Sequence, residues 1–250
     1  MKIQPITKTE SGRGPIYQSG GASVLFHDGS PFDSDPLKRA FDLAVERDAE
    51  LHNDLLPERI SEARQRTLGA LMSRASGDAI NAARLAKSEA IAADARQMEP
   101  ARPIEHAIGV ELREHVRALP IADQARWIEQ TNLEGLTAIV DGGNRAALEV
   151  NLYDRARERF WIENWIARHN AESNHPAQPS VDTVLATGPD HAALRAEAEG
   201  YLAQHRERMA SIDDNEAIAK RLVGFLAAVF DITPEKALDR IVGRDDAQAA

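Results

Sequence analysis

The most regular hydrophobic pattern of the chain is a stripe of small apolar side chains within residues 68–93. Its members lie three or four residues apart, close to the period of an α-helix: Leu68, Leu71, Ala75, Ala79, Ala82, Ala86, Ala90 and Ala93. The pattern predicts a long helix with one narrow apolar face. Because alanine buries little area, we expect this face to pack closely against another helix, in this chain or in a second copy. Ser76-Gly77-Asp78 could divide the helix in two, since Gly disfavours a helix interior and Asp caps a new start.

Prolines, glycines and capping residues divide the rest of the chain into further helices. Ser34-Asp35-Pro36 supplies a cap and a first-turn proline for a helix over 36–55, and Pro57 begins a second. The run 99–103 contains two prolines and ends the long helix. Periodicity and breakers then predict helices at 104–119, 121–130, 132–141, 144–171 and 190–210, another capped by Asp213-Asp214, and a last one capped by Thr233-Pro234. The sequence therefore predicts an all-α fold.

Residues 1–35 differ from the helical remainder because they are rich in Gly, Ser and Pro. Ile16-Tyr17 and Val24-Leu25-Phe26 flank Ser19-Gly20-Gly21, an arrangement that suits a short hairpin. An isolated hairpin is marginally stable in water. We therefore interpret this segment as an extended Gly-rich arm, which either is flexible or docks on a neighbouring subunit.

These patterns divide the chain into four consecutive parts. They are an N-terminal arm, a long-helix region, a helical core block and C-terminal helices, at 1–35, 36–99, 103–172 and 190–243. The core block holds every tryptophan of the chain, so we expect the densest core there. Large aromatic side chains and arginines are common anchors of interfaces. The side chains that we expect to contact a partner are Tyr17, Phe26, Arg157, Trp161, Trp165, Phe225 and Phe230.

Composition narrows the classes of function. Thirty basic against 40 acidic residues give a net charge of −10, which makes nucleic acid an unlikely main partner. The chain has no cysteine, which excludes disulfides and thiolate metal sites. No stretch is apolar for long enough to span a membrane, and no apolar run follows the first residues, so we expect neither a membrane anchor nor a signal peptide.

Candidate catalytic and metal-binding patterns are weak. Glu172 and His175 form a Glu-x-x-His pair, and Asp48/His52 and Glu111/His115 lie one helical turn apart. In an acidic helical chain such pairs arise as surface ion pairs, so we expect no metal and no cofactor. Neither a nucleophile elbow nor a phosphate-binding Gly-rich loop occurs. The sequence therefore predicts a protein that is not an enzyme.

Two further segments admit more than one interpretation. Residues 153–161 interleave Arg with aromatic residues, which suits a core helix with surface ion pairs, a protein interface or a nucleic-acid groove. Residues 181–185 could form an extended strand, for which the sequence offers no pairing partner. The helices of 213–242 suit either internal packing or docking to a partner.

The region 105–150 is similar to a segment of uncharacterised helical proteins of tailed bacteriophages. The similarity lies in the helix with Glu111-Leu112-Arg113, the short helix with Arg126-Trp127-Ile128 and the helix with Leu136-Thr137-Ala138-Ile139. Two positions depart from that pattern. Asn132-Leu133 stands where Gly-Asp usually opens the third helix, and Gly142-Gly143 replaces the usual proline.

This resemblance implies a virion or head-assembly context, without assigning any catalytic residue. Together with the arm and the alanine stripe, it favours a non-enzymatic structural or assembly protein that contacts other virion proteins and forms a homo-oligomer. Such a protein would be cytoplasmic during assembly, and the sequence leaves open whether it then becomes part of the virion. The alternative is a helical regulatory or nucleic-acid-associated protein, motivated by the Arg/aromatic run.

Overall fold

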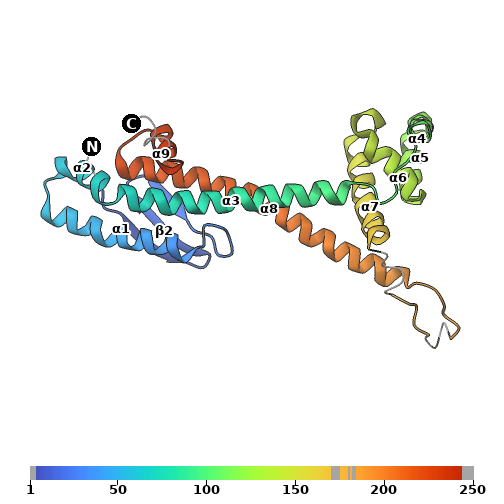
Figure 1. Ribbon diagram of the computed structural model, residues 1–250, viewed down its shortest axis with the longest axis horizontal. Coiled ribbons are helices and arrows are strands. Elements are labelled where there is room, and N and C mark those ends of the chain that lie inside the picture. The colour runs from blue at the N-terminus through green and yellow to red at the C-terminus, as the bar shows by residue number, and fades with distance from the viewer. Residues whose placement is uncertain (1–3, 170–174, 180, 182–183, 244–250) are drawn as a thin grey trace. The chain divides into compact units, whose positions relative to one another are not determined.

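The protein is mostly helical, with 71% of its residues in helices and a small N-terminal sheet. The computed structural model describes residues 4–169, 175–179, 181 and 184–243. The chain forms two compact units, Met1–Ala90 with Arg208–Ala250 (unit 1) and Ile91–Glu207 (unit 2), coloured by residue number in Figure 1. Within the described residues, no helix is both long and apolar enough to cross a lipid bilayer.

Unit 1 begins with an antiparallel sheet where the sequence predicted an extended arm. Its strands β1 (Thr7–Ser11), β2 (Gly14–Ser19) and β3 (Ala22–Leu25) lie in the order β1-β2-β3. The hairpin β2–β3 pairs Tyr17 with Val24, and both side chains are buried. The prediction of an arm was wrong for two reasons: β1 adds a third strand, and the apolar face of the hairpin packs on the helices of its own unit.

Helices complete unit 1. They are α1 (Asp35–Asp54), α2 (Pro57–Thr67), most of α3 (Gly69–Met98), the end of α8 (His191–Phe230) and α9 (Pro234–Ile241). The predicted caps are confirmed at two of them, where the hydroxyls of Ser34 and Thr233 accept hydrogen bonds from Leu37 and Lys236. The core combines side chains from the sheet and from helices far apart in sequence: Tyr17, Phe26, Phe32, Leu37, Phe41, Leu68, Met72, Leu222, Phe225 and Phe230.

Unit 2 is helical throughout its described residues. Besides the end of α3 and the start of α8, it contains α4 (His106–Ala118), α5 (Ile121–Gln130), α6 (Leu133–Gly142), a short 3-10 turn at Gly143–Ala146 and α7 (Val150–Arg168). One core cluster joins α5, α6 and α7, and another joins α7 to α8. The expected boundaries of α4, α5 and α6 are close to those observed, whereas α7 begins at Val150 and not at 144.

Two helix breaks predicted from the sequence do not occur. Helix α3 continues through residues 76–78, and α8 continues through Asp213-Asp214. Gly77 serves packing instead, since a Cβ atom there would lie 2.7 Å from the carbonyl oxygen of Ile241. Both aspartates are exposed, so they remain solvated on the surface of α8 and cap nothing.

The apolar face of α3 is displaced from the predicted stripe. Three stripe members, Leu68, Ala79 and Ala90, are buried, but Ala82 and Ala86 are exposed. Met72, which lies beside the stripe in sequence, is fully buried. The buried residues of α3 within unit 1 therefore combine apolar with small polar side chains, which an alanine count does not detect: Gly69, Met72, Ser73, Ser76, Gly77, Ala79 and Ala90.

Candidate protein interaction surface

An apolar groove lies between α3, α8 and α9 of unit 1. Its volume is about 460 Å³. Its aliphatic lining consists of Ile80 and Ala83 from α3, Ile212, Ala219 and Val223 from α8, and Pro234 and Leu238 from α9. Residues 212–223 of α8 follow one another along this lining, which gives the groove a length of about 16 Å at 1.5 Å per residue. We call this feature the α3–α8–α9 groove.

Local sequence explains how α9 forms one wall of the groove. Thr233 and Pro234 start the helix, and α9 then buries Ala237 and Ile241 against the core. The missing side chain of Gly77 allows the backbone of Ile241 to approach α3 closely. Leu238, on the neighbouring face of α9, therefore lies at the groove and is 41% exposed.

The rim of the groove is basic although the whole chain is acidic. Lys87 of α3 lies 2.9 Å from Glu216 of α8, and Lys220 lies 3.4 Å from the same carboxylate. These bonds lower the pKa of Glu216, Lys87 having the larger effect, and the bond to Glu216 raises the pKa of Lys87. Arg84 also lines the rim, and no described residue forms an ion pair with it. The groove thus carries three cations and one carboxylate, and two of these cations, Lys87 and Lys220, share that carboxylate.

The four aromatic contact residues that the sequence predicted in unit 1 lie in its core. Tyr17, Phe26, Phe225 and Phe230 are at most 1% exposed. The rings of Tyr17 and Phe26 both pack against Phe41, and the Tyr17 hydroxyl donates a hydrogen bond of 2.7 Å to Asp42. These side chains are therefore not available to a partner in this structure, which instead exposes the smaller groove residues.

The three predicted contact residues of unit 2 belong to helix packing and to a charged network. Trp161 stacks on His205 with ring centroids 5.9 Å apart, and both tryptophans of α7 are at least 91% buried. Arg157 and His205 both lie 3.0 Å from carboxylate oxygens of Asp94. The structure thus brings Arg157 and Trp161 together around one network, while Trp165 stacks between His169 and Tyr201.

The other arginines of the Arg/aromatic run also have acceptors in their own chain. Arg155 lies 2.5 Å from Glu129, and Arg159 donates to the carbonyl oxygen of Ile128. The interpretation of this run as a core helix with surface ion pairs agrees with these contacts. They add no support for a nucleic-acid groove.

The candidate metal pairs have other partners or remain simple pairs. Asp48 is fully buried and accepts two hydrogen bonds from Arg64. Glu172 lies outside the described residues, and His175 pairs with Glu197 at 2.5 Å. Among the residues that the structure describes, no three His, Asp or Glu side chains gather in a way that could hold a metal ion.

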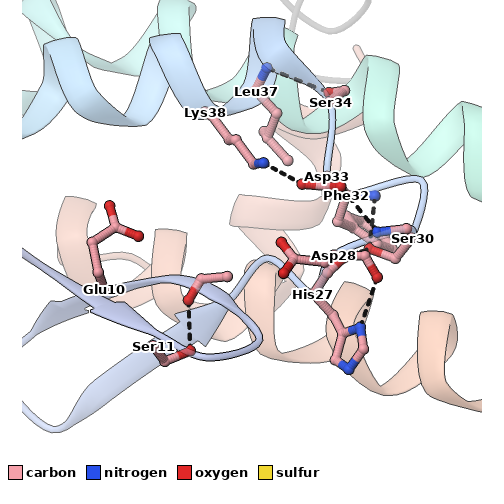
Figure 2. Close-up of polar contacts among 12 residues, drawn as sticks. Glu10, Ser11, His27, Asp28, Ser30, Phe32, Asp33, Ser34, Leu37 and Lys38 are labelled. Carbon is pink, nitrogen blue, oxygen red and sulfur yellow. Dashed lines mark hydrogen bonds and ion pairs between the residues drawn. The ribbon is translucent and has the colours of Figure 1, made fainter.

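A polar cleft lies elsewhere in unit 1, beside the loop between β3 and α1. The loop is internally bonded, because Ser30 donates to the carbonyl oxygen of His27 and the Gly29 amide donates to Asp33 (Figure 2). Lys38 and then the Gly29 amide lower the pKa of Asp33. The charged residues that line the cleft balance one another, so its electrostatics favour neither sign of ligand: Arg13, Asp28, Asp214 and Arg221.

The loop before α8 in unit 2 exposes large aliphatic side chains. Val181, Val184 and Leu185 are 95%, 67% and 90% exposed. The sequence had suggested a strand over 181–185, but Val184 and Leu185 lie in a turn, and residues 182–183 lie outside the described residues. Neither this exposure nor the groove follows from periodicity, since each depends on what the tertiary structure leaves uncovered.

Comparisons with protein-family models, with curated proteins and with solved structures find no match to this chain.

Proposed function

We propose that this chain is a non-enzymatic structural or assembly protein of a tailed phage, working through contacts with other virion proteins and with copies of itself. The observation that carries the proposal is the α3–α8–α9 groove. Seven of its twelve lining residues are aliphatic, and the other five are Arg84, Lys87, Asn215, Glu216 and Lys220. Such a surface favours contacts with a peptide segment, whereas bond-making chemistry needs polar groups aimed at a reacting atom.

The dimensions of the groove support a protein partner. A groove about 16 Å long matches roughly three turns of a docked helix, or a short extended segment. A large apolar surface left open on a soluble unit commonly marks an interaction site. The resemblance of residues 105–150 to helical phage proteins supports the virion context independently of the groove.

The proposal predicts that genes adjacent to the gene of this chain encode portal or capsid proteins, and the test is to produce the full chain together with the proteins that those genes encode. We expect it to copurify with portal rings or capsid assemblies. Leu238→Asp places a carboxylate in the groove, and we expect it to reduce the copurified amount at least tenfold. Leu56→Asp is the matched control, because Leu56 is 64% exposed, lies off the groove and occupies the N-cap of α2, where Asp is favourable.

Mass photometry of each preparation measures the stoichiometry. If the wild-type chain never associates with any of these proteins, the proposed function is wrong. If Leu238→Asp copurifies as well as the wild type, the groove does not carry the contact. Circular dichroism shows whether each variant has kept its helices.

A further inference from the structure

The charges of the α3–α8–α9 groove gather toward one of its ends. Helix α9 packs over Gly77 of α3, where a Cβ atom would lie 2.7 Å from the carbonyl oxygen of Ile241. Lys87 lies ten residues further along α3, which corresponds to about 15 Å in a helix. Its bond of 2.9 Å to Glu216 places this part of α8 at the same end, and Lys220 reaches the same carboxylate. One end of the groove therefore borders α9, and the other end is ionic.

The end beside α9 is aliphatic. Ile80 lies three residues from Gly77 on α3, Val223 comes from α8, and Pro234 and Leu238 come from α9. Ile80 and Val223 pack on the core of unit 1 but remain half-buried, and Leu238 is 41% exposed. A segment that covers these side chains removes apolar surface from water, so this end favours apolar side chains of a partner.

The ionic end carries more positive than negative charge. The lining residues Arg84, Lys87, Lys220 and Glu216 give the groove a net charge of +2, in a chain whose net charge is −10. Both lysines already bond to Glu216, whereas no carboxylate of the described chain pairs with Arg84. Asp213, which lies outside the lining, acts on Lys87 through its charge. Cations still outnumber carboxylates when Asp213 is counted, so this end favours an acidic partner.

The walls of the groove fit a helix better than an extended strand. Lining residues recur every three or four positions from Ile80 to Lys87 on α3 and from Ile212 to Val223 on α8, which is about two and about three helical turns. The backbone groups of helix interiors are bonded within the helix, so these walls offer no free edge to which a strand could add. A third helix instead packs between two such faces through side chains spaced three or four residues apart.

We infer that the groove binds an amphipathic helix of another protein, in which an apolar stripe adjoins a cluster of carboxylates. The stripe covers Ile80, Val223 and Leu238, and the carboxylates lie beside Arg84 and Lys87. This inference rests on the proposed function and states the chemistry of the partner segment. The apolar contact supplies most of the affinity, and the charges select the partner and its direction in the groove.

The probe is a fluorescently labelled peptide of about 15 residues, long enough to form a helix that spans the groove. It begins with a cluster of glutamates and continues with leucines at every third or fourth position; a second peptide has lysine in place of each glutamate. Fluorescence anisotropy with the full chain measures the affinity for each. We expect the wild type to bind the acidic peptide at least tenfold more tightly than the basic one, and Leu238→Asp to weaken binding of the acidic peptide at least tenfold.

A charge-reversal variant gives the decisive comparison. Arg84→Glu/Lys220→Glu changes the net charge of the groove lining from +2 to −2, so this variant should prefer the basic peptide. Arg59→Glu/Arg74→Glu is the matched control, because it changes the net charge of unit 1 equally at two exposed positions off the groove. It should keep the preference of the wild type. Each protein is tested with both peptides, so a difference in helix content between the peptides cancels.

Three results would overturn the inference. They are a wild type that binds neither peptide or binds both equally, a charge-reversal variant that keeps its helices by circular dichroism and still prefers the acidic peptide, and self-association of the wild type that Leu238→Asp abolishes in sedimentation velocity. The last result would identify a second copy as the occupant. None of them affects copurification with virion proteins, so failure of this inference is distinguishable from failure of the proposed function.

Discussion

Replacement of Arg64 by methionine tests how unit 1 holds its N-terminal segment. Arg64 of α2 is 1% exposed, and its guanidinium lies 2.5 and 2.8 Å from the two carboxylate oxygens of Asp48 in α1. It also donates to the carbonyl oxygens of Gln4 and Val229, at 2.7 and 3.4 Å. Asp48 in turn accepts the amide of Ile6 at 2.7 Å. One buried pair thus joins the start of the chain to α1, α2 and the end of α8.

The expected loss is large because the variant leaves a buried carboxylate without its cation. Breaking a buried ion pair from one side costs about 3–5 kcal/mol. For a chain of this size, that corresponds to a melting temperature lower by roughly 6–20 °C. The same change at Arg66, two residues further along α2, serves as the control. The side chain of Arg66 is 77% exposed, and Glu62 is its ion-pair partner among the described residues, so we expect Arg66→Met to cost less than about 1 kcal/mol.

Urea unfolding followed by two signals locates the loss. All three tryptophans lie in unit 2, so tryptophan fluorescence reports that unit, whereas circular dichroism reports the helices of both units. We expect Arg64→Met to lower the midpoint measured by circular dichroism more than the midpoint measured by fluorescence. A loss below about 1 kcal/mol, or a loss equal to that of Arg66→Met, would refute the reasoning.

The double variant Asp48→Leu/Arg64→Met separates the two terms. It removes both charges and with them the uncompensated carboxylate, so we expect it to be more stable than Arg64→Met alone. It still loses the acceptor for the Ile6 amide, which costs about 1–3 kcal/mol, so recovery should be incomplete. A double variant that is less stable than Arg64→Met would contradict this reasoning, because it would show that Asp48 stabilises the fold without Arg64, for instance through the Ile6 amide.

Two further predictions concern unit 1. Gly77→Ala should destabilise the chain by about 1–3 kcal/mol, because its Cβ would lie 2.7 Å from the carbonyl oxygen of Ile241. At Gly224 a Cβ would meet open space, so Gly224→Ala should stabilise the chain by about 0.5–1 kcal/mol. Urea unfolding measures both changes. Burial, and then the hydrogen bond to Asp42, raise the pKa of Tyr17. As the pH rises, the unfolded chain therefore loses the Tyr17 proton before the folded chain does. The contribution of Tyr17 to the free energy of unfolding should be complete below about pH 10 and fall above it. Tyr17→Phe should show a smaller fall when urea midpoints are compared at about pH 8 and about pH 11.

Local signals in the sequence predicted much of the helical structure. Ser34 with Pro36, Pro57 and Thr233 with Pro234 mark helix starts that the structure contains, because a cap or a first-turn proline acts within one turn. The Gly-rich N-terminal segment shows the limit of such signals. Every residue of β1 is exposed, so its sequence has no apolar alternation that could predict a strand. Only its pairing with β2 defines it.

The interaction surface was less predictable because burial depends on residues far apart in sequence. Phe225 and Phe230 were predicted to contact a partner because their side chains are large and aromatic. The same size places them in the core, where they fill the space between sheet and helices. The groove lies beside them, on Ala219 and Val223, whose smaller side chains leave a depression. In unit 2 the run at 153–161 had allowed three interpretations, and the contacts of Arg157 with Asp94 could not be read from spacing.

The difference between the predicted and the observed buried face of α3 bears on the proposed function. The alanine stripe was interpreted as a face that needs close helical company, yet its middle members Ala82 and Ala86 are exposed. The helix instead places Ile80 and Ala83 at the groove, about 100° around the helix axis from Ala79 and Ala82, where α8 and α9 cover them only in part. A second segment that filled the groove would complete this burial. The packing partner that the stripe suggested is therefore still expected, but at the groove, which Val223 of α8 and Leu238 of α9 also line. Variants at these two positions test this expectation most directly.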